Sequence, residues 1–501
     1  MSQKRTVIYK LERHKWPDEI AAEKRERRKK LAVIGSCLLF FIAGFFLSRA
    51  TIGGVSGGEK SAEMEKFDTV YSLMNEKWYF GKDIEDLSTV LMENAIAAMA
   101  ASSIDPHTSY MSLEDAASFS SSLEGTFIGV GLQFYENSKG EYVVLDIFEN
   151  SPAQQAGIER GDVLVSIDSH ACNELSQDEI KTLLSKEQDQ AVELSVKRNG
   201  KTLSLQVVPS VVDNSVIAYV EDGYGYIRLS SFAENSAADM ESALKRISAA
   251  SESKLILDLR DNGGGYLSAA MDIAKYFLPK GSVVFQSEDR NGNRSEYRLE
   301  DDYTPFSFDR IVILMNGNTA SASEALISAL NDHLGDQVVL VGTTTYGKGT
   351  MQTSIPFSDG TSIKYTSAQW FSSNGETING VGIDPDIEVQ LDEARTTTML
   401  IYKNDIEVKE DEVADIAKPV QIYLRFLGYD ADRSDAYFSA RSAQALRAFQ
   451  KDHGLTADGV IDNETAQALA DAAGIYWNEH RNELDTQLNK AMEIIYGREA
   501  V

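Results

Sequence analysis

The chain contains little cysteine and little positive charge for its length. Its 501 residues include only two cysteines, Cys37 in an apolar run and Cys172 in the body of the chain. We therefore expect no internal disulfide, no metal site and no cofactor. Lys and Arg number 48 against 77 Asp and Glu, which gives a net charge of −29. This acidity argues against nucleic-acid binding, which needs clustered positive charge.

Long apolar runs are also scarce. Residues 31–47 form one run without a charge, and residues 1–30 before it carry eleven Lys or Arg against five Asp or Glu. This asymmetry predicts a cytoplasmic basic leader (1–30), a single transmembrane helix (31–49), and a body outside the cell membrane. The alternative is a signal peptide cleaved among the small residues after Leu47. A lipoprotein site at Cys37 is disfavoured because the apolar run continues past it.

A serine lies at the predicted start of a helix. The stretch 316–324 reads Asn-Gly-Asn-Thr-Ala-Ser-Ala-Ser-Glu, and apolar residues follow it with helical spacing. Ser321 and Glu324 have the S-x-x-E form of a capping box, which places Ser321 where backbone N–H groups point outward. A serine in this setting is ordinarily a helix cap, and that interpretation of Ser321 has to be weighed against a catalytic one.

A lysine follows after one helix and one strand. Residues 337–341 are typical of a buried strand, and the turn 346–349 (Tyr-Gly-Lys-Gly) would carry Lys348 back toward Ser321. Gly342 to Lys348 also match the first seven positions of a phosphate-binding G-x-x-x-x-G-K loop. The next residue is Gly349 instead of Ser or Thr, and a strand follows instead of a helix, so we disfavour a nucleotide site.

A lysine can activate a serine only when its amine is neutral. Free lysine has a pKa of about 10.4, so desolvation must disfavour the ammonium form before it can accept a proton at neutral pH. We therefore expect Lys348 to be largely buried without a carboxylate partner. The neutral amide of Gln352 suits this requirement, since it can orient the amine without stabilising its charge. Gln352→Glu should accordingly impair turnover by raising the lysine pKa.

A glycine-rich turn lies upstream of the serine. It has the sequence Asn262-Gly-Gly-Gly265, between the apolar strand 255–259 and a helical pattern from Leu267. Its glycines permit close backbone approach near a helix start. A dinucleotide-binding loop is disfavoured because position 268 is Ser instead of Gly. At the serine itself, the N–H of Ala322 is a predicted donor to an oxyanion.

Four segments together resemble the carboxyl-terminal processing proteases, a family of tail-specific serine peptidases. They are residues 226–232, 255–265, 319–324 and 346–352, in the family's order. The resemblance implies that Ser321 is the nucleophile, Lys348 the general base and Gln352 the third member. It also implies that a glycine of the turn, Gly264 or Gly265, supplies the second oxyanion donor beside Ala322.

The chain departs from the family pattern at two places near this site. Asp336-Gln337 lengthen the loop between helix and strand, and Gly263 stands where the family often has Pro. The first departure leaves Ser323 as a rival nucleophile.

A Ser-His-Asp triad is the competing arrangement, since the chain has six histidines. Only His107 and His333 fall in segments like those of the family. His107 belongs to Asp105-Pro-His-Thr-Ser-Tyr110, whose role in the family is structural. His333 is predicted at a helix C-terminus, where its use would be a contact with the helix dipole.

Residues 126–209 resemble a PDZ domain, which binds peptide carboxyl ends as an added strand. The resemblance implies that the N–H groups of Gly129, Val130, Gly131 and Leu132 hold a terminal carboxylate, and that a helix bearing Ile180 and Leu183 lines the side-chain pocket. The alternative for the glycines is an ordinary strand bend. The family often has Arg-Gly at the end of this helix, whereas the chain has Leu184-Ser-Lys186, so we do not expect gating through that arginine.

The remaining segments complete a multidomain α/β chain. A crotonase-like protease core is expected to receive the PDZ domain as an insertion, and a small helical peptidoglycan-binding module follows. The predicted boundaries outside the PDZ domain are a tether (50–60), a helical segment with a positioning and dimerising role (61–125), the core (210–400), an acidic linker (401–414), the module (415–475) and a terminal amphipathic helix of unknown partner (476–501).

Two functions are compatible with this organisation. The first is a membrane-anchored serine endopeptidase that captures exported protein tails on its PDZ domain, hydrolyses peptide bonds with Ser321 and Lys348, and docks on peptidoglycan, as a monomer or a homodimer. The second is a catalytically silent scaffold at the cell wall, in which the PDZ domain and the module bind partners and Ser321 only caps its helix.

Overall fold

The protein is described by a computed structural model that covers residues 61–186, 190–401 and 406–497. These residues fall into two compact units, one up to residue 95 and one from residue 96. The predicted leader (1–30), transmembrane helix (31–49) and tether (50–60) lie outside the described residues. Within the described ranges, no helix is both long and apolar enough to cross a bilayer.

The first unit is helical, as expected for the segment from residue 61. It contains α2 (Ala62–Lys77), the 3-10 helix η1 (Tyr79–Asp83) and the start of α3 (Leu87–Ala100). The hydroxyl of Ser61 accepts a hydrogen bond from the N–H of Met64 and caps α2.

The segment predicted as a PDZ domain, in the second unit, is built from one antiparallel sheet and short helices. Its strands are in the order β3-β4-β5-β7-β8, with β6 paired to β5, so that β3 lies at the edge. Ile167, Cys172, Ile180 and Leu194 are fully buried between the sheet and α6, and burial raises the pKa of Cys172 to about 11. The elements are β3 (Leu132–Glu136), β4 (Tyr142–Ile147), α5 (Pro152–Gln155), β5 (Val163–Ile167), β6 (His170–Ala171), η2 (Cys172–Glu174), α6 (Gln177–Leu184), β7 (Val192–Arg198) and β8 (Lys201–Val207).

A two-stranded ribbon joins this domain to the rest of the unit. It pairs β2 (Thr126–Gly129) with β9 (Ser210–Asp213), and β2 follows directly on α4 (Leu113–Glu124). Further contacts link the loop after β4 to α7 (Ser236–Ala249), where Arg246 pairs with Glu149 and Asn150 donates to Asp239 at 2.7 Å. The PDZ domain is therefore fixed to the core at both its chain ends and through a helix.

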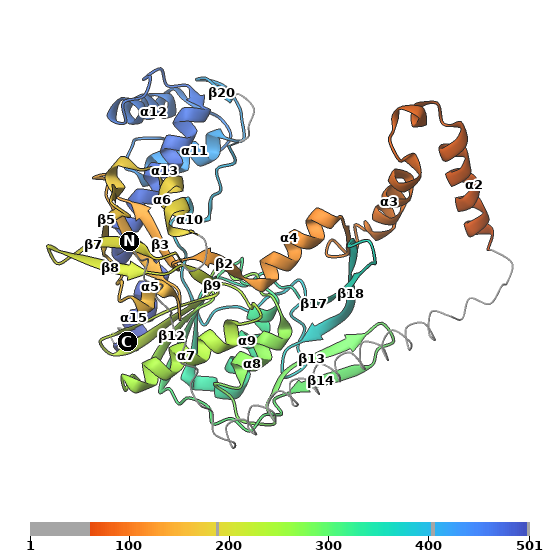
Figure 1. The fold of residues 1–501 in the computed structure, drawn as a ribbon, viewed down its shortest axis with the longest axis horizontal. Coiled ribbons are helices and arrows are strands. Elements are labelled where there is room, and N and C mark those ends of the chain that lie inside the picture. The colour runs from red at the N-terminus through yellow and green to blue at the C-terminus, as the bar shows by residue number, and fades with distance from the viewer. Residues whose placement is uncertain (1–60, 187–189, 402–405, 498–501) are drawn as a thin grey trace, which may run out of the picture. The chain divides into compact units, whose positions relative to one another are not determined.

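The segment predicted as the protease core contains a six-stranded sheet in the order β10-β11-β12-β15-β16-β19. All neighbouring strands are parallel except β10, which is antiparallel to β11. Alternate residues of the central strands point to opposite faces. Leu255, Leu257 and Ile313 pack beneath α7, α8 and α9 on one face (Figure 1). The elements are β10 (Val216–Glu221), β11 (Tyr224–Leu229), β12 (Lys254–Asp258), α8 (Leu267–Ala274), β15 (Arg310–Met315), α9 (Ala322–Leu334), η3 (Gly335–Gln337), β16 (Val338–Gly342), β19 (Ile387–Glu388) and α10 (Glu393–Thr396).

The other face of this sheet is covered by the C-terminal helix. Leu488, Ala491 and Ile495 of α15 (Thr486–Ile495) pack against Ile256 and Val312. This answers the question of the terminal helix's partner, which the sequence left open. It also explains why the central strands are apolar on both faces, as buried parallel strands are.

A second sheet carries the strand that follows Lys348. Its order is β1-β18-β13-β14, with β17 paired to β18. The segment containing His107 leads into β1, which pairs with β18 through Ser109 and Lys364. The strands are β1 (Ser109–Met111), β13 (Val283–Asp289), β14 (Arg294–Arg298), β17 (Thr350–Pro356) and β18 (Ser362–Phe371).

The C-terminal module is a small three-helix bundle around Val420, Leu446, Phe449 and Leu469. Its helices are α11 (Ala417–Phe426), α12 (Ala440–Asp452) and α13 (Asn463–Glu479), and a short ribbon pairs β20 (Glu407–Val408) with β21 (Ile461–Asp462). Helix α13 continues past the predicted end of the module at residue 475, and α14 (Arg481–Leu484) follows it.

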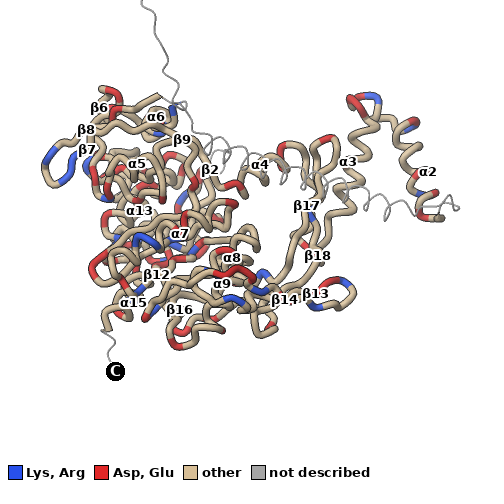
Figure 2. The backbone as a smooth tube through the Cα atoms, turned by 60° about the horizontal axis from the view of Figure 1, so that its bottom comes forward, with Lys and Arg blue, Asp and Glu red and all other residues tan. Residues whose placement is uncertain are grey.

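Acidic positions are spread over the described elements instead of being gathered in one patch (Figure 2).

Candidate active site

Ser321 lies at the N-terminus of α9, after a turn held at several points. Its backbone is in the positive-φ region (φ 60°), which non-glycine residues rarely adopt. The hydroxyl of Thr319 donates to the carbonyl of Leu259 at 2.8 Å, and the N–H of Ala320 donates to the carbonyl of Asn262 at 3.0 Å. These bonds tie the serine turn to the glycine-rich turn and maintain the unusual conformation.

The side chain of Glu324 connects the serine to the lysine loop. It is fully buried, and its carboxylate accepts from the N–H of Ser321 at 2.7 Å and from the N–H of Lys348 at 2.9 Å. It also accepts from the Thr345 hydroxyl and the Gly347 N–H, both at 2.6 Å. A buried carboxylate is stable only when its oxygens are satisfied, and four donors meet that requirement. Glu324 thus fixes both backbones at once.

Lys348 lies in the loop between β16 and β17, where its side chain is partly buried. Burial lowers the pKa of the Lys348 amine, the nearby ammonium of Lys364 lowers it further, and the carboxylate of Glu324 opposes the shift. Among the described residues, no ion pair involves Lys348. We expected Lys348 to have no carboxylate near it, and this is only partly correct. The carboxylate of Glu324 binds the backbone N–H of Lys348 and lies close enough to the amine to raise its pKa.

The glycine-rich turn approaches the serine closely. Gly264 has φ +100°, and a Cβ there would lie 2.8 Å from the Cβ of Ser321 and 3.0 Å from the nitrogen of Ala322. Only glycine fits at that position. Its N–H donates to Oδ1 of Asn262 at 2.9 Å, so in this arrangement that N–H is already used. Ala322 is the first residue of α9, and its N–H therefore has no acceptor inside the helix.

Gly265 contributes to the same turn in a different way. It has φ +142°, and a Cβ there would lie 2.3 Å from the carbonyl oxygen of Phe232. Gly265 therefore lies against the backbone of Phe232, which follows β11, and not against Ser321. Of the two predicted glycine donors, Gly264 is therefore the one in contact with Ser321.

A cavity of about 590 Å³ brings the predicted residues together. Ser321, Lys348, Gln352, Gly264 and Gly265 all line it, although they come from three separate segments of the chain. Phe119 and Leu123 of α4 add apolar walls on the side from which the chain enters the PDZ domain. The cavity is large enough for several residues of an extended peptide.

Gln352 is placed in the cavity but does not contact the amine as expected. Its amide donates to the hydroxyl of Thr350 at 2.9 Å and to that of Thr366 at 3.3 Å. A register shift between Met351 and Gln352 in the β17–β18 pairing accompanies this orientation. In the described part of the chain, no hydrogen bond joins Gln352 or the Ser321 hydroxyl to the Lys348 amine.

Of the rival residues, Ser323 and His333 are engaged elsewhere. Ser323 is fully buried and its hydroxyl donates to the carbonyl of Asn262 at 2.9 Å, which leaves it facing the turn instead of the cavity. A ring nitrogen of His333 contacts the carbonyl of Val283 at 2.8 Å, so its partner is a strand instead of its own helix end. His107 lies near the dyad, because burial and the charge of Lys348 lower the pKa of its imidazole. Its backbone N–H donates to Oδ1 of Asp105 at 3.0 Å, and its segment binds β18 through Thr108, which accepts from the N–H of Thr366 at 3.0 Å.

Sequence reasoning missed the wider roles of Glu324, Asn262 and Lys364. Glu324 had been interpreted only as half of a capping box, because its contacts to residues 345–348 depend on the fold. Asn262 is fully buried and donates to the carbonyl of Leu229 at 2.8 Å. In the sequence, Glu324 and Asn262 are each a polar residue beside glycines or small residues. Only the structure shows that both are buried and which groups they bind.

The predicted tail-binding residues lie together at the edge of the PDZ sheet. A Cβ on Gly129 would lie 3.6 Å from the carbonyl oxygen of Leu184, so the segment 129–132 runs beside the end of α6. The carbonyls of Val130 and Gly131 accept from Ala153 and Phe148, which fixes the turn before the edge strand. Leu132 then begins β3.

The two predicted pocket residues on α6 differ in exposure. Ile180 is fully buried in the PDZ core, whereas Leu183 is only partly buried. Ile180 therefore contributes to the core and not to an open pocket, because α6 points it and Leu184 toward the sheet. Lys186, just after the end of α6, pairs with Asp168.

Comparisons with known proteins agree with this geometry. Residues 223–389 match the model of peptidase family S41, residues 127–208 match a PDZ domain, and residues 415–469 match a peptidoglycan-binding domain.

Two curated relatives from Bacillus subtilis (strain 168) are similar over nearly the whole chain. The carboxy-terminal processing protease CtpB is 30% identical over 87% of this chain and 90% of its own length. The carboxy-terminal processing protease CtpA is 28% identical over 93% of this chain and 96% of its own length. The chain therefore belongs to peptidase family S41 and is a serine-type carboxyl-terminal processing protease with a PDZ domain and a peptidoglycan-binding domain.

Proposed function

We propose that Ser321 and Lys348 form the catalytic dyad. The neutral amine of Lys348 takes the hydroxyl proton while the Ser321 oxygen attacks the carbonyl carbon of the scissile bond. The resulting oxyanion is stabilised by the Ala322 N–H and, once the N–H of Gly264 leaves Oδ1 of Asn262, by the glycine-rich turn. The lysine ammonium then protonates the leaving amine as the C–N bond breaks. A water molecule, activated by the same amine, hydrolyses the acyl-enzyme and restores Ser321.

The contact that carries this proposal is the Glu324 carboxylate, which binds the N–H groups of Ser321 and Lys348 together. It supports the dyad because it places both residues on one cavity without forming an ion pair with the amine. The lowered pKa of Lys348 supports the role of base, since a larger fraction of the amine is neutral near pH 7. During turnover, Gln352 would exchange its hydrogen bonds to Thr350 and Thr366 for one to the Lys348 amine and so orient it.

We further propose that the PDZ domain captures the carboxyl ends of exported proteins. The edge position of β3 supports this, because an edge strand offers backbone groups to which an extended peptide can add. The N–H groups of residues 129–132 would hold the terminal carboxylate, and Leu183 on α6 would contact the last side chain. Cleavage would then occur upstream in the same polypeptide, in the cavity at Ser321.

The location of the protein is also a proposal. The apolar run 31–47 and the basic residues before it support a single-pass anchor with a cytoplasmic N-terminus. The C-terminal module supports docking on peptidoglycan, and a crotonase-like core with an inserted PDZ domain is the arrangement that we propose for the exported part. The helical segment from residue 61 would position or dimerise the chain.

Removal of either dyad residue should abolish proteolysis. We expect Ser321→Ala and Lys348→Met to lower kcat/KM for an unstructured protein with an apolar tail by about 10³-fold or more. Ser323→Ala, which changes the neighbouring rival, should stay within roughly a few-fold of the unchanged enzyme. Gel-based cleavage assays with purified protein measure all three. Full activity in Ser321→Ala, or its loss only in Ser323→Ala, would reject the assignment.

The pH dependence should respond to Lys364. Because the active form of Lys348 is neutral, kcat/KM should rise with pH through the pKa of this amine. Lys364→Met removes a charge that lowers the pKa of Lys348, so the rise should move to higher pH. Activity at pH 7 should fall by roughly two- to fivefold and recover in alkaline buffer, while Lys364→Arg keeps the original profile. Identical profiles for the Met and Arg variants would contradict this.

Tail recognition can be tested from the substrate side. A substrate whose terminal carboxylate is amidated should lose about tenfold or more in kcat/KM, because the N–H groups of residues 129–132 lose a charged acceptor. The matched control is the same substrate with a free carboxylate. Equal cleavage of the two forms would show that the domain does not read the chain terminus.

The proposed location predicts two separable attachments. The full chain should sediment with membranes, and a chain starting at residue 50 should not. Both should bind insoluble peptidoglycan to a similar extent in a co-sedimentation assay. Soluble behaviour of the full chain would reject the anchor, and failure of both chains to bind peptidoglycan would reject wall docking.

A further inference from the structure

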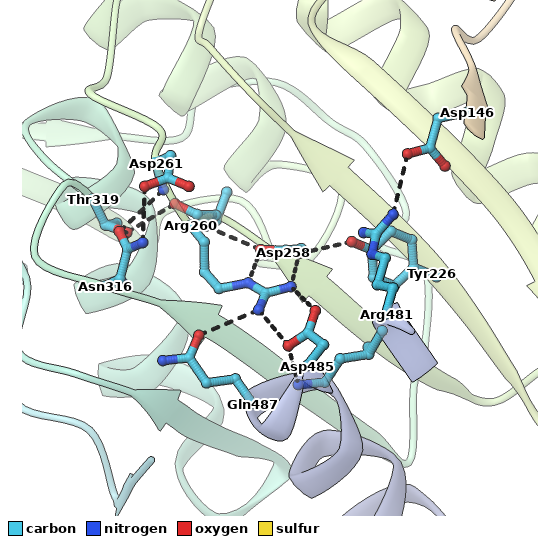
Figure 3. Close-up of polar contacts among 12 residues, drawn as sticks. Asp146, Tyr226, Asp258, Arg260, Asp261, Asn316, Thr319, Arg481, Asp485 and Gln487 are labelled. Carbon is cyan, nitrogen blue, oxygen red and sulfur yellow. Dashed lines mark hydrogen bonds and ion pairs between the residues drawn. The ribbon is translucent and has the colours of Figure 1, made fainter. Parts of the chain in front are cut away.

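A buried ionic cluster lies at the end of β12, just before the glycine-rich turn in the chain (Figure 3). Its centre is Arg260, whose Nε and Nη2 donate to the two oxygens of Asp258 at 2.9 and 2.6 Å. Asp485 binds the guanidinium from another side, accepting from Nη1 at 2.7 Å and from Nη2 at 3.0 Å. Nη1 also donates to Gln487 at 3.3 Å. All five N–H groups of the arginine are therefore satisfied.

Asp485 reaches this cluster from the far end of the chain. It follows α14 and caps α15 by accepting from the N–H of Leu488 at 3.0 Å. The next two residues bind the core, since Thr486 donates to the carbonyl of Gln390 and Gln487 to that of Val389, both at 2.8 Å. With α15 packed on the sheet, the carboxylate of Asp485 is held in a fixed place.

Arg260 is paired with two carboxylates, although one would neutralise its charge. Asp258 alone would neutralise Arg260, and burying a second carboxylate costs desolvation energy. Arg228 lies near Asp258, and Arg481, on the same segment as Asp485, lies close enough to Asp485 for the two charges to interact. Burial alone would lower the pKa of Arg260, but the two aspartates hold it well above its ordinary value. What the second carboxylate adds is geometric, because it clamps the guanidinium from two sides.

The clamped arginine leads directly into the active site. Two residues after Arg260, the carbonyl of Asn262 accepts from the Ala320 N–H at 3.0 Å and from the Ser323 hydroxyl at 2.9 Å. Its side chain accepts from the N–H of Gly264, the residue that touches Ser321. A displacement of Arg260 would therefore shift Asn262 and, through its hydrogen bonds to Ala320 and Gly264, change the position of Ser321 relative to the oxyanion donors.

We propose that Asp485 is a positioning residue for peptide hydrolysis, acting through Arg260 on the turn 261–264. The segment after the peptidoglycan-binding domain is then part of the catalytic apparatus and not an appendage. This inference rests on the proposed dyad, because it concerns the alignment of Gly264 and Ala322 with Ser321. Without the Asp485 carboxylate, Nη1 loses its charged acceptor, the arginine is held from one side only, and the turn can shift relative to the serine.

The test uses the full chain carrying Asp485→Asn, with Glu493→Gln as the matched control. Glu493→Gln makes the same carboxylate-to-amide change on α15, but it removes only an exposed ion pair with Lys490 and does not touch Arg260. Cleavage of a peptide substrate should show kcat reduced by about ten- to a hundredfold in Asp485→Asn, with KM within roughly twofold. The rise of kcat/KM with pH should keep its position, since Lys348 is untouched. Glu493→Gln should match the unchanged enzyme.

The outcomes separate this inference from the proposed dyad. Unchanged kcat in folded Asp485→Asn overturns the positioning role even when cleavage still requires Ser321. Absence of Ser321-dependent cleavage in the unchanged chain rejects the dyad, and the inference with it. Circular dichroism verifies folding. If Asp485→Asn does not fold, Asp485→Glu decides, because a normal kcat there would assign the carboxylate to stability alone, whereas a reduced kcat at unchanged KM supports the inference.

Discussion

The active site depends on one buried carboxylate. Glu324 accepts hydrogen bonds from the backbone of Ser321, which follows β15, and from the loop that carries Lys348, which leads from β16 of the same sheet to β17 of the second sheet. An unsatisfied carboxylate in this position would be strongly destabilising, so the fold requires all its donors to be present. The hydrogen bonds that satisfy the buried carboxylate come from the backbones of Ser321 and Lys348, and they therefore also hold these two residues at one cavity. Its use of backbone N–H groups leaves the lysine amine unpaired.

The two sheets and the C-terminal helix of the second unit position the segments that form the site. The six-stranded sheet provides the turns at Leu259 and Met315 from the ends of two adjacent parallel strands, as open α/β sheets commonly place their sites. The second sheet closes the cavity with β17 and β18. The C-terminal segment covers the remaining face and reaches the ionic cluster at Arg260. Residues far from the chemistry in sequence thus determine the geometry of the catalytic turn.

Much of this site could be predicted from local patterns. The strand 255–259, the helix after Ser321 and the strand before Gly342 followed from apolar periodicity, and the four motifs assigned roles to Ser321 and Lys348. Local patterns failed where three-dimensional contacts decide. Ile180 and Leu183 are three residues apart on one helix, yet only the fold determines which of them faces the core. Gln352 binds two threonine hydroxyls through strand pairing that no spacing indicates. The partner of the terminal helix could not be predicted either, because amphipathicity indicates a buried face without naming what covers it.

The central claim is that a neutral lysine amine activates Ser321. The most direct measurement is the rate at which a serine-reactive fluorophosphonate modifies the enzyme as a function of pH, with the modified residue located by mass spectrometry. We expect modification at Ser321, with a rate that rises through a pKa below that of an ordinary lysine, and almost no modification when Lys348 is replaced by Met. Equal rates with and without Lys348, or modification of another residue, would contradict the account.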